Sequence, residues 1–298
     1  MKKAKILSLL LCIVMILSTL SFSACNANPD AGKTQGETPA DDSGDKNNPA
    51  DPDKESDTTN QENKLYRKTV IWNGDSICRG NSSTGTWADR IAAKNGIKIW
   101  KNYGVGGGTI VENAPYFQNG NPRHSVCATL EQMHDEYPDA DYIILEGGTN
   151  DADLLGRITE GDIPLRFGSF SPDDFSGEYD RATFCGALES IFYRAKQLWP
   201  DKTVCYIVAQ KMGLNAPKSA NRYAYFEAAM QICEKWEIPY LNLWDNCDLD
   251  PTLPEMYDPS KSAEENEQAS MYRDGQHLTN AGYDYTADII DAWLKTLP

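Results

Sequence analysis

Histidines and basic residues are scarce in this sequence. It has three histidines, and its cysteines show neither a CxxC pair nor another metal-binding spacing. Zinc sites take their ligands mainly from closely spaced histidines and cysteines, so we predict no metal, and no motif indicates another cofactor. The 28 lysines and arginines are outnumbered by 44 acidic residues, which gives a formal charge of −16. Nucleic acids and anionic surfaces require a basic patch, so neither is expected as a partner.

Bulky apolar residues are nearly absent between residue 26 and about residue 64, where Asp, Asn, Pro, Thr and Gly predominate. Such a segment cannot bury enough surface to offset its chain entropy. We therefore predict that residues 25–64 form a disordered acidic linker. The remaining residues, 65–298, suffice for one α/β domain.

The first 24 residues have the pattern of a secretory signal peptide. Residues 1–5 are basic, residues 6–20 are apolar, and small residues precede Cys25. The apolar run is short and no stop-transfer pattern follows, which argues against a membrane span. The small residues before Cys25 resemble the bacterial lipoprotein signal, in which the cysteine is lipidated and becomes the mature N-terminus. We expect an exported protein anchored to the bacterial cell membrane by that lipid alone; an ordinary cleavage site followed by an accidental cysteine is the alternative.

Six cysteines fall within the predicted domain. They are Cys78, Cys127, Cys185, Cys205, Cys233 and Cys247. An even number in an exported domain permits disulfides, but a domain of this size does not need them. We favour buried free thiols, and the sequence leaves their pairing open.

Short apolar runs alternate with amphipathic segments along the domain. The predicted strands are 69–72, 97–102, 142–145, 204–209 and 238–243. The predicted helices are 86–96, 126–137, 184–198, 223–236 and a last helix capped by Thr279. Strands that alternate with helices indicate an α/β fold with a five-stranded parallel sheet covered on both faces. Residues 153–180 show no sustained period and are predicted to form a long loop, which could be a lip over the substrate.

Ser76 follows the first predicted strand, directly after the turn-forming residues 73–75. Ligands of parallel α/β sheets bind at the carboxyl ends of the strands. Taken alone, Ser76 could simply cap the next helix. Three other loops, however, hold complementary groups: glycines at 104–108, Asn150 after the third strand, and Asp274 with His277 before the last helix. A serine nucleophile needs a base, a group that orients the base, and donors for the oxyanion.

The glycine-rich loop is interpreted as a source of oxyanion donors. It lacks the Lys-Ser/Thr ending of a P-loop and does not contain GxGxxG in order. The sequence does not decide which of Gly106, Gly107 and Gly108 donates. Asp75 and Asp151 are predicted to accept hydrogen bonds from turn amides.

The remaining polar candidates have structural interpretations. His124 and His134 lie outside these segments and are predicted to be packing or surface residues. Cys78 has no base among its sequence neighbours and is not predicted to be a nucleophile.

Four segments together resemble the ordered motif blocks of the SGNH (GDSL-type) hydrolases, and the resemblance spans residues 71–277. The segments are Asn73–Ser76, Asn102–Thr109, Gly148–Asp151 and Asp274–His277. The resemblance implies a flavodoxin-like three-layer α/β/α sandwich. Ile77 stands where the motif name has leucine, a change that should matter little if the side chain packs inward.

The same resemblance implies a role for each matched residue. Ser76 would be the nucleophile, His277 the base and Asp274 the group that orients it. Gly107 and Asn150 would donate to the oxyanion together with the Ser76 backbone N–H.

We therefore predict a serine esterase that hydrolyses O-acyl esters through an acyl-enzyme. Exported members of the family suggest O-acetylated carbohydrate substrates. One alternative is a lysophospholipase or thioesterase, which would require an apolar acyl channel. Another is a non-catalytic glycan-binding surface lipoprotein. The sequence gives neither the acyl chain, the sugar nor the oligomeric state.

Overall fold

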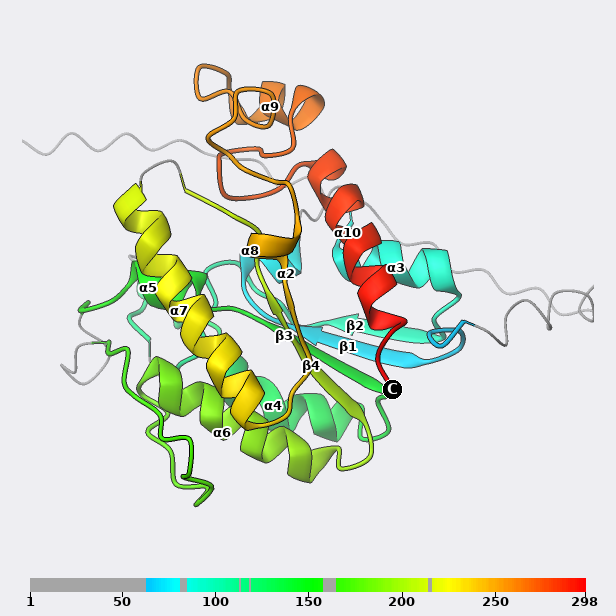
Figure 1. The fold of residues 1–298 in the computed structure, drawn as a ribbon, viewed down its shortest axis with the longest axis vertical. Helices are drawn as coiled ribbons and strands as arrows, with labels where there is room; N and C mark the ends of the chain where they lie inside the picture. Colours follow the sequence, from blue (N-terminus) through cyan, green and yellow to red (C-terminus); the bar gives the residue numbers. More distant parts are fainter. Residues whose placement is uncertain (1–62, 81–84, 113, 118, 158–164, 214–215) are drawn as a thin grey trace, which may run out of the picture. The chain divides into compact units, whose positions relative to one another are not determined.

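Five parallel strands form one sheet in the order β2-β1-β3-β4-β5 (Figure 1). The strands are β1 (Thr69–Asn73), β2 (Ile99–Asn102), β3 (Tyr142–Glu146), β4 (Thr203–Val208) and β5 (Tyr240–Asn242). The computed structural model describes residues 63–80, 85–112, 114–117, 119–157, 165–213 and 216–298. The predicted signal peptide, Cys25 and the linker up to residue 62 lie outside these residues.

Helices cover both faces of the sheet, which confirms the predicted sandwich. They are α2 (Ser76–Arg79), α3 (Trp87–Asn95), α4 (Val126–Glu136), α5 (Thr149–Asp153), α6 (Phe184–Leu198), α7 (Ala216–Lys235), α8 (Leu243–Asn246), α9 (Ala263–Ala269) and α10 (Asn280–Leu294). Helix α3 packs against α10 on one side, and α4, α6 and α7 pack in sequence on the other (Figure 1). Within the described part of the chain, no helix is long and apolar enough to cross a bilayer.

Local signals fix most helix ends. Thr86 and Asp89 form a capping box at the start of α3, and Gly96 ends that helix with a left-handed φ of 63°. Thr279 caps α10, as predicted, by accepting a hydrogen bond from Gly282 N. Helix α7 begins seven residues before the predicted 223, because its first two turns are largely polar and lack apolar periodicity.

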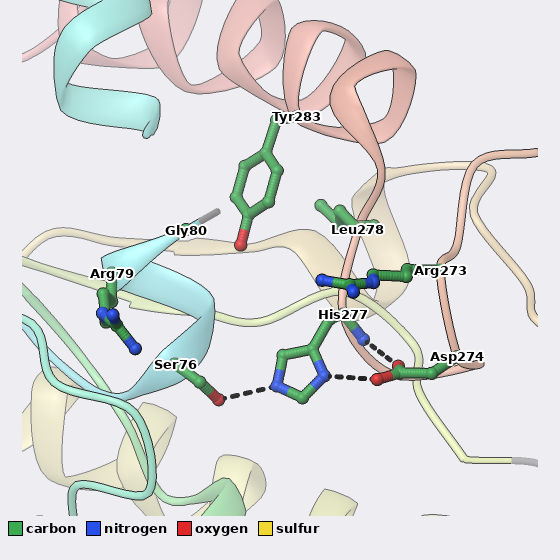
Figure 2. A pocket seen from close by; sticks show the side chains of 8 residues that line it. All are labelled: Ser76, Arg79, Gly80, Arg273, Asp274, His277, Leu278 and Tyr283. Atoms are coloured by element: carbon green, nitrogen blue, oxygen red, sulfur yellow. Dashed lines mark hydrogen bonds and ion pairs between the residues drawn. The ribbon is translucent and has the colours of Figure 1, made fainter. Parts of the chain in front are cut away.

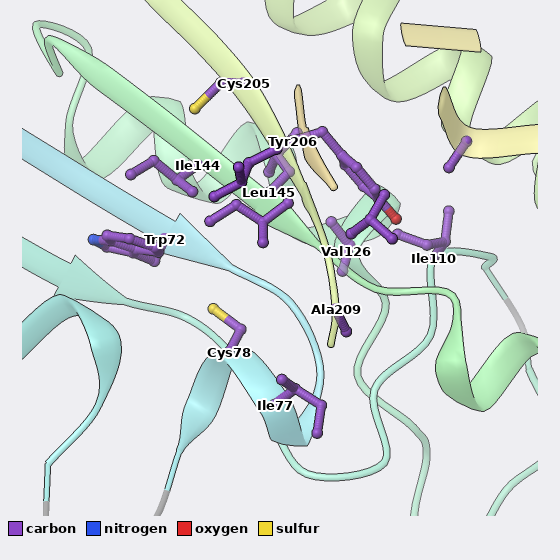
Figure 3. Packing of buried hydrophobic residues seen from close by; sticks show 14 of the residues in the cluster. Trp72, Ile77, Cys78, Ile110, Val126, Ile144, Leu145, Cys205, Tyr206 and Ala209 are labelled. Carbon is purple, nitrogen blue, oxygen red and sulfur yellow. The ribbon is translucent and has the colours of Figure 1, made fainter. Parts of the chain in front are cut away.

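The central strands form the core, and their residues are buried on both faces. Figure 3 shows Trp72, Ile144 and Tyr206 from three neighbouring strands, with Ile77 and Cys78 of α2 turned toward them. All six cysteines of the described domain are buried and carry free thiols. A one-turn helix is therefore packed against the sheet at the point where β1 ends, which gives Ser76 a firm support.

The strand order reverses at β1. From β1 the chain first moves to β2 on one side and then crosses to β3 on the other side. At such a switch point the loops at the carboxyl ends diverge and leave a crevice. The chain places Ser76 just after β1 and Asn150 just after β3. The topology thus brings two of the predicted site residues to one edge of the sheet.

The described part of the loop 153–180 has no strand or helix beyond the end of α5. It packs on α6 and α7, where Lys235 donates to Asp174 O at 2.5 Å and pairs with Glu189 at 2.7 Å. Phe175 lies edge-on to Trp236, with ring centroids 5.1 Å apart. These contacts hold that part of the loop against the helical layer.

Candidate active site

Ser76 is the first residue of α2 and is held by the tight turn that leaves β1. Asp75 caps the helix by accepting from Ile77 N at 2.8 Å. A Cβ at Gly74 would lie 2.6 Å from Glu146 Oε2 and 2.7 Å from Cys78 Cβ, so only glycine fits there. The turn therefore directs the Ser76 side chain out of the core, where it is half-buried.

A continuous chain of hydrogen bonds links Ser76, His277 and Asp274 (Figure 2). Ser76 Oγ lies 2.9 Å from His277 Nε2, and His277 Nδ1 lies 2.8 Å from Asp274 Oδ2. An ionised carboxylate only accepts, so Nδ1 must carry the proton and the neutral ring accepts from Ser76 through Nε2. Asp274 is itself fixed, because its Oδ1 accepts from the backbone N–H groups of Gln276 and His277.

His277 and Asp274 shift each other's pKa toward the charged forms. Burial alone would lower the pKa of His277, but the hydrogen bond and charge of Asp274, together with the charge of Asp75, raise it above its ordinary value. Burial would raise the pKa of Asp274, yet its bonds to His277 outweigh this and lower the pKa to about 2. Asp274 is therefore ionised, and His277 is a stronger base than free imidazole.

The glycine loop lies against the turn before Ser76, because Val105 N donates to Gly74 O at 3.1 Å. Gly108 N donates to Val105 O at 2.9 Å, which closes a turn and removes Gly108 as a free donor. The N–H groups of Gly106, Gly107 and Ser76 have no acceptor among the described residues. Gly107 has a φ of 75°, and a Cβ there would lie 2.6 Å from Phe117 and 2.9 Å from Arg123. The turn thus leaves Gly106 and the confined Gly107 as possible donors and excludes Gly108.

The Asn150 side chain reaches this loop but is already engaged. Its Nδ2 lies 2.8 Å from Gly108 O and 3.1 Å from Asp75 Oδ2, so each of its two hydrogens has an acceptor. An oxyanion would have to displace one of these acceptors. The sequence placed Asn150 correctly near the site but could not show this competition.

Three buried carboxyl groups lie beneath the site. Asp75 and Asp151 accept from turn amides, as predicted; Asp151 receives Ile110 N at 2.9 Å. Glu146, the last residue of β3, was not predicted and accepts from Asp75 N at 3.1 Å. Burial raises the pKa of all three, that of Asp151 to about 7. The signal for Glu146 was an acidic residue at the end of an otherwise apolar strand.

A buried arginine, also missed from the sequence, anchors the loop that carries Asp274 and His277. Arg222 of α7 has a side chain only 1% exposed and binds Asp153 through two hydrogen bonds of 3.0 and 2.7 Å. Its Nη2 also donates to Gln276 Oε1 at 2.6 Å. Gln210 Nε2 donates to Gln276 O at 3.1 Å. Helix α7 and the end of β4 therefore hold the loop from behind.

The other histidines have structural roles, as predicted. His124 Nε2 lies 2.8 Å from Asn73 Oδ1, and burial lowers its pKa. His134 packs edge-on against Trp199. Burial raises the pKa of the Cys78 thiol well above its ordinary value, which makes it a poor nucleophile. No group of three possible metal ligands is gathered anywhere in the described ranges.

A cavity of about 370 Å³ opens beside Ser76. Its lining residues are Ser76, Arg79, Gly80, Arg273, Asp274, His277, Leu278 and Tyr283 (Figure 2). None of the described residues of the loop 153–180 is among them, so the expected lip is not formed by that part of the loop. The reason is its attachment to α6 and α7. Residues 158–164 lie outside the described residues.

Comparisons with known proteins identify the family and agree with the fold. Residues 73–285 match the model of the GDSL-like Lipase/Acylhydrolase family. A solved structure from Lactobacillus plantarum is similar in fold, with a TM-score of 0.58 and 23% identity over 78% of this chain and 98% of that one. A carbohydrate acetylesterase from Sinorhizobium meliloti matches at a TM-score of 0.50 and 14% identity, over 78% and 100% of the two chains. An inhibitor-bound aryl esterase from M. smegmatis matches at a TM-score of 0.51 and 12% identity, over 78% of this chain and 100% of that one. A search of curated protein sequences gave no match.

Proposed function

Because this chain belongs to the GDSL-like Lipase/Acylhydrolase family and is an ester-bond hydrolase, we propose that Ser76, His277 and Asp274 are its catalytic triad. The observation that carries the proposal is the hydrogen-bond chain from Ser76 Oγ through both ring nitrogens of His277 to Asp274 Oδ2. Ser76, at the start of α2, and Asp274, in the loop before α10, are 198 positions apart, yet the three residues meet with the distances that proton transfer requires.

The reaction follows from these contacts. Ser76 Oγ attacks the acyl carbonyl carbon while its proton passes to His277 Nε2, and Asp274 stabilises the imidazolium. Collapse of the tetrahedral intermediate breaks the bond to the alcohol oxygen, which takes the proton from His277. A water molecule then attacks the acyl-enzyme, giving one proton to His277. That proton returns to Ser76 as the carboxylic acid leaves.

The oxyanion of the intermediate is assigned to the backbone N–H groups of Ser76 and Gly107. Both lack an acceptor among the described residues, and the φ of Gly107 together with Phe117 confines its position. Asn150 joins them only if its amide leaves Asp75 Oδ2 when negative charge develops on the substrate.

The substrate is proposed to be an O-acetylated carbohydrate. Among the described residues that line the cavity, Leu278 is the sole aliphatic side chain, and the others are polar, glycine or Tyr283. A long acyl chain needs an apolar channel next to the nucleophile, and the cavity described beside Ser76 is not such a channel. A sugar, in contrast, presents hydroxyl groups that suit a polar wall. Export and lipidation at Cys25 complete the proposal and would place the enzyme at the outer face of the cell membrane.

The test is acetate release from a panel of acetylated polysaccharides, combined with a series of chromogenic esters of increasing acyl length. We expect acetate release and a steep fall in kcat/KM beyond short chains. Ser76→Ala is the matched negative control. A preference for long acyl chains or lysophospholipids would replace the carbohydrate assignment with a lipid acylhydrolase. Polysaccharide binding without hydrolysis would favour the glycan-binding alternative.

A further inference from the structure

Two guanidinium groups flank the cavity beside Ser76, and the catalytic steps described above do not use them. Arg79 ends α2 on one wall, and Arg273 comes from the loop of Asp274 on the other (Figure 2). The backbone N–H of Arg79 donates to Asp75 O at 2.9 Å, but its guanidinium makes no hydrogen bond or ion pair with any described residue. Arg273 lies 3.7 Å from Glu264, whose side chain is 78% exposed, which makes a weak pair.

The charge of this cavity is opposite to that of the chain. With a neutral imidazole, the described residues of its lining supply two guanidiniums and one carboxylate, a net charge of +1, whereas the chain carries −16. The carboxylate is Asp274, which is occupied by His277 and two backbone N–H groups. Ser76 and His277 are bonded to each other, and the Tyr283 hydroxyl donates to Ile77 O at 2.8 Å. The uncommitted donors in the lining are therefore mainly the two arginines.

The position of the cavity indicates which part of the substrate it receives. His277 lines it and must return a proton to the leaving alcohol oxygen, so the alcohol lies on this side of Ser76. Gly107, an assigned oxyanion donor, is not part of the lining. An acetyl group would fill only a small part of about 370 Å³. The space therefore suits the sugar and not the acyl group.

We propose that Arg79 and Arg273 select an ester whose alcohol part carries a negative charge, an acidic sugar bearing a carboxylate or a phosphate. The inference rests on the proposed function, since it assigns the charge of the alcohol that the triad releases. Guanidinium groups bind both anions through paired N–H donors, and they are effective in a half-enclosed site. Arginines at this position would also attract such a substrate toward an otherwise acidic protein.

The experiment compares acetate release from three mono-O-acetylated sugars: a methyl glucuronoside, the matching methyl glucoside and the glucoside 6-phosphate. The parent is expected to favour the better of the two anionic esters over the neutral one by about tenfold or more in kcat/KM. High salt should reduce the preference. The carboxylate and phosphate arms identify which anion is recognised, and preference for either supports the proposal.

Arg79→Gln combined with Arg273→Gln should bring the ratio of anionic to neutral kcat/KM close to one, and each single variant should lower it partly. Lys98→Gln is the matched control, because it removes the same positive charge far from the cavity. Lys98 lies at the amino end of β2, whereas the cavity lies at the carboxyl ends of the strands. Arg79→Lys keeps the charge and should retain part of the preference. Fluorophosphonate labelling of Ser76 checks that each variant is folded.

A ratio near one in the parent, or an unchanged ratio in the double variant, would overturn the proposal. These results differ from a failure of the proposed function. If the parent releases acetate neither from the three sugars nor from small acetyl esters, the esterase assignment fails. If it releases acetate equally from all three, the triad stands and the selection of charge by Arg79 and Arg273 is refuted.

Discussion

The loop that carries His277 and Asp274 is anchored to α7 through the side chain of Gln276, and Gln276→Ala removes that anchor. Gln276 Oε1 accepts from Arg222 Nη2 at 2.6 Å, while Arg222 keeps its two bonds to Asp153 in the variant. A hydrogen bond from a charged donor contributes about 1.5–3 kcal/mol to stability. The lower end applies, because Gln210 still holds the Gln276 backbone carbonyl.

The free energy of unfolding should therefore fall by about 1.5 kcal/mol, which lowers Tm by roughly 3–6 °C in a domain of this size. Activity should fall further than stability alone explains. A displacement of about 1 Å in a reacting group can cost about 10²-fold in rate. Since Gln276 directly precedes His277, we expect kcat for a short-chain chromogenic ester to fall at least about tenfold, with KM changing less.

Thermal unfolding and steady-state kinetics measure the two effects separately, and Gln276→Glu is the control. The glutamate carboxylate can accept the same bond from Arg222 and should restore both Tm and most of kcat. If Gln276→Ala lowers Tm as expected but leaves kcat at the parental value, the anchor stabilises the fold without positioning His277. If the alanine and glutamate variants behave alike, the bond to Arg222 is irrelevant to either property.

Three further predictions follow. Activity should be lost as the pH falls through the raised pKa of His277, because protonation removes the base. Asp274→Asn should move this acid limb of the pH profile to lower pH. A limb that stays in place would show that the titrating group is not His277 paired with Asp274. Asn150→Ala should lower kcat by about 10²–10³ if its amide leaves Asp75 for the oxyanion, whereas a loss below tenfold in a folded variant would assign the oxyanion to backbone donors alone. Cys25→Ser should shift the exported protein from the detergent phase to the aqueous phase in a detergent partition, and an aqueous parent would exclude the lipid anchor.

The elements that hold Ser76 were predictable because their signals are local. The apolar run of β1, the turn at 73–75 and the capping residue Thr279 each act within a few positions, and the structure places them as predicted. The parallel sheet followed from the alternation of strands and helices. The meeting of Ser76 with His277 was predictable only because four separate segments fit one known pattern.

The support around the site could not be predicted, because it depends on pairs that are distant in sequence. Arg222 and Gln276 are separated by 54 positions, and neither lies in a periodic pattern that would indicate burial. Glu146 at the end of β3 reaches the turn at Asp75 after the neighbouring strand β1, although the two residues are 71 positions apart. The exclusion of Gly108 as a donor depends on a backbone turn that glycine composition alone does not specify.

The central claim, that Ser76 is a nucleophile activated by His277, is tested most directly by labelling with a fluorophosphonate and identifying the modified residue by mass spectrometry. We expect the label on Ser76 in the parent and its loss in His277→Ala, and we expect Ser76→Ala and His277→Ala each to remove most hydrolysis of acetyl esters, with little added by combining them. Label on another residue, or near-parental hydrolysis by Ser76→Ala, would contradict the account.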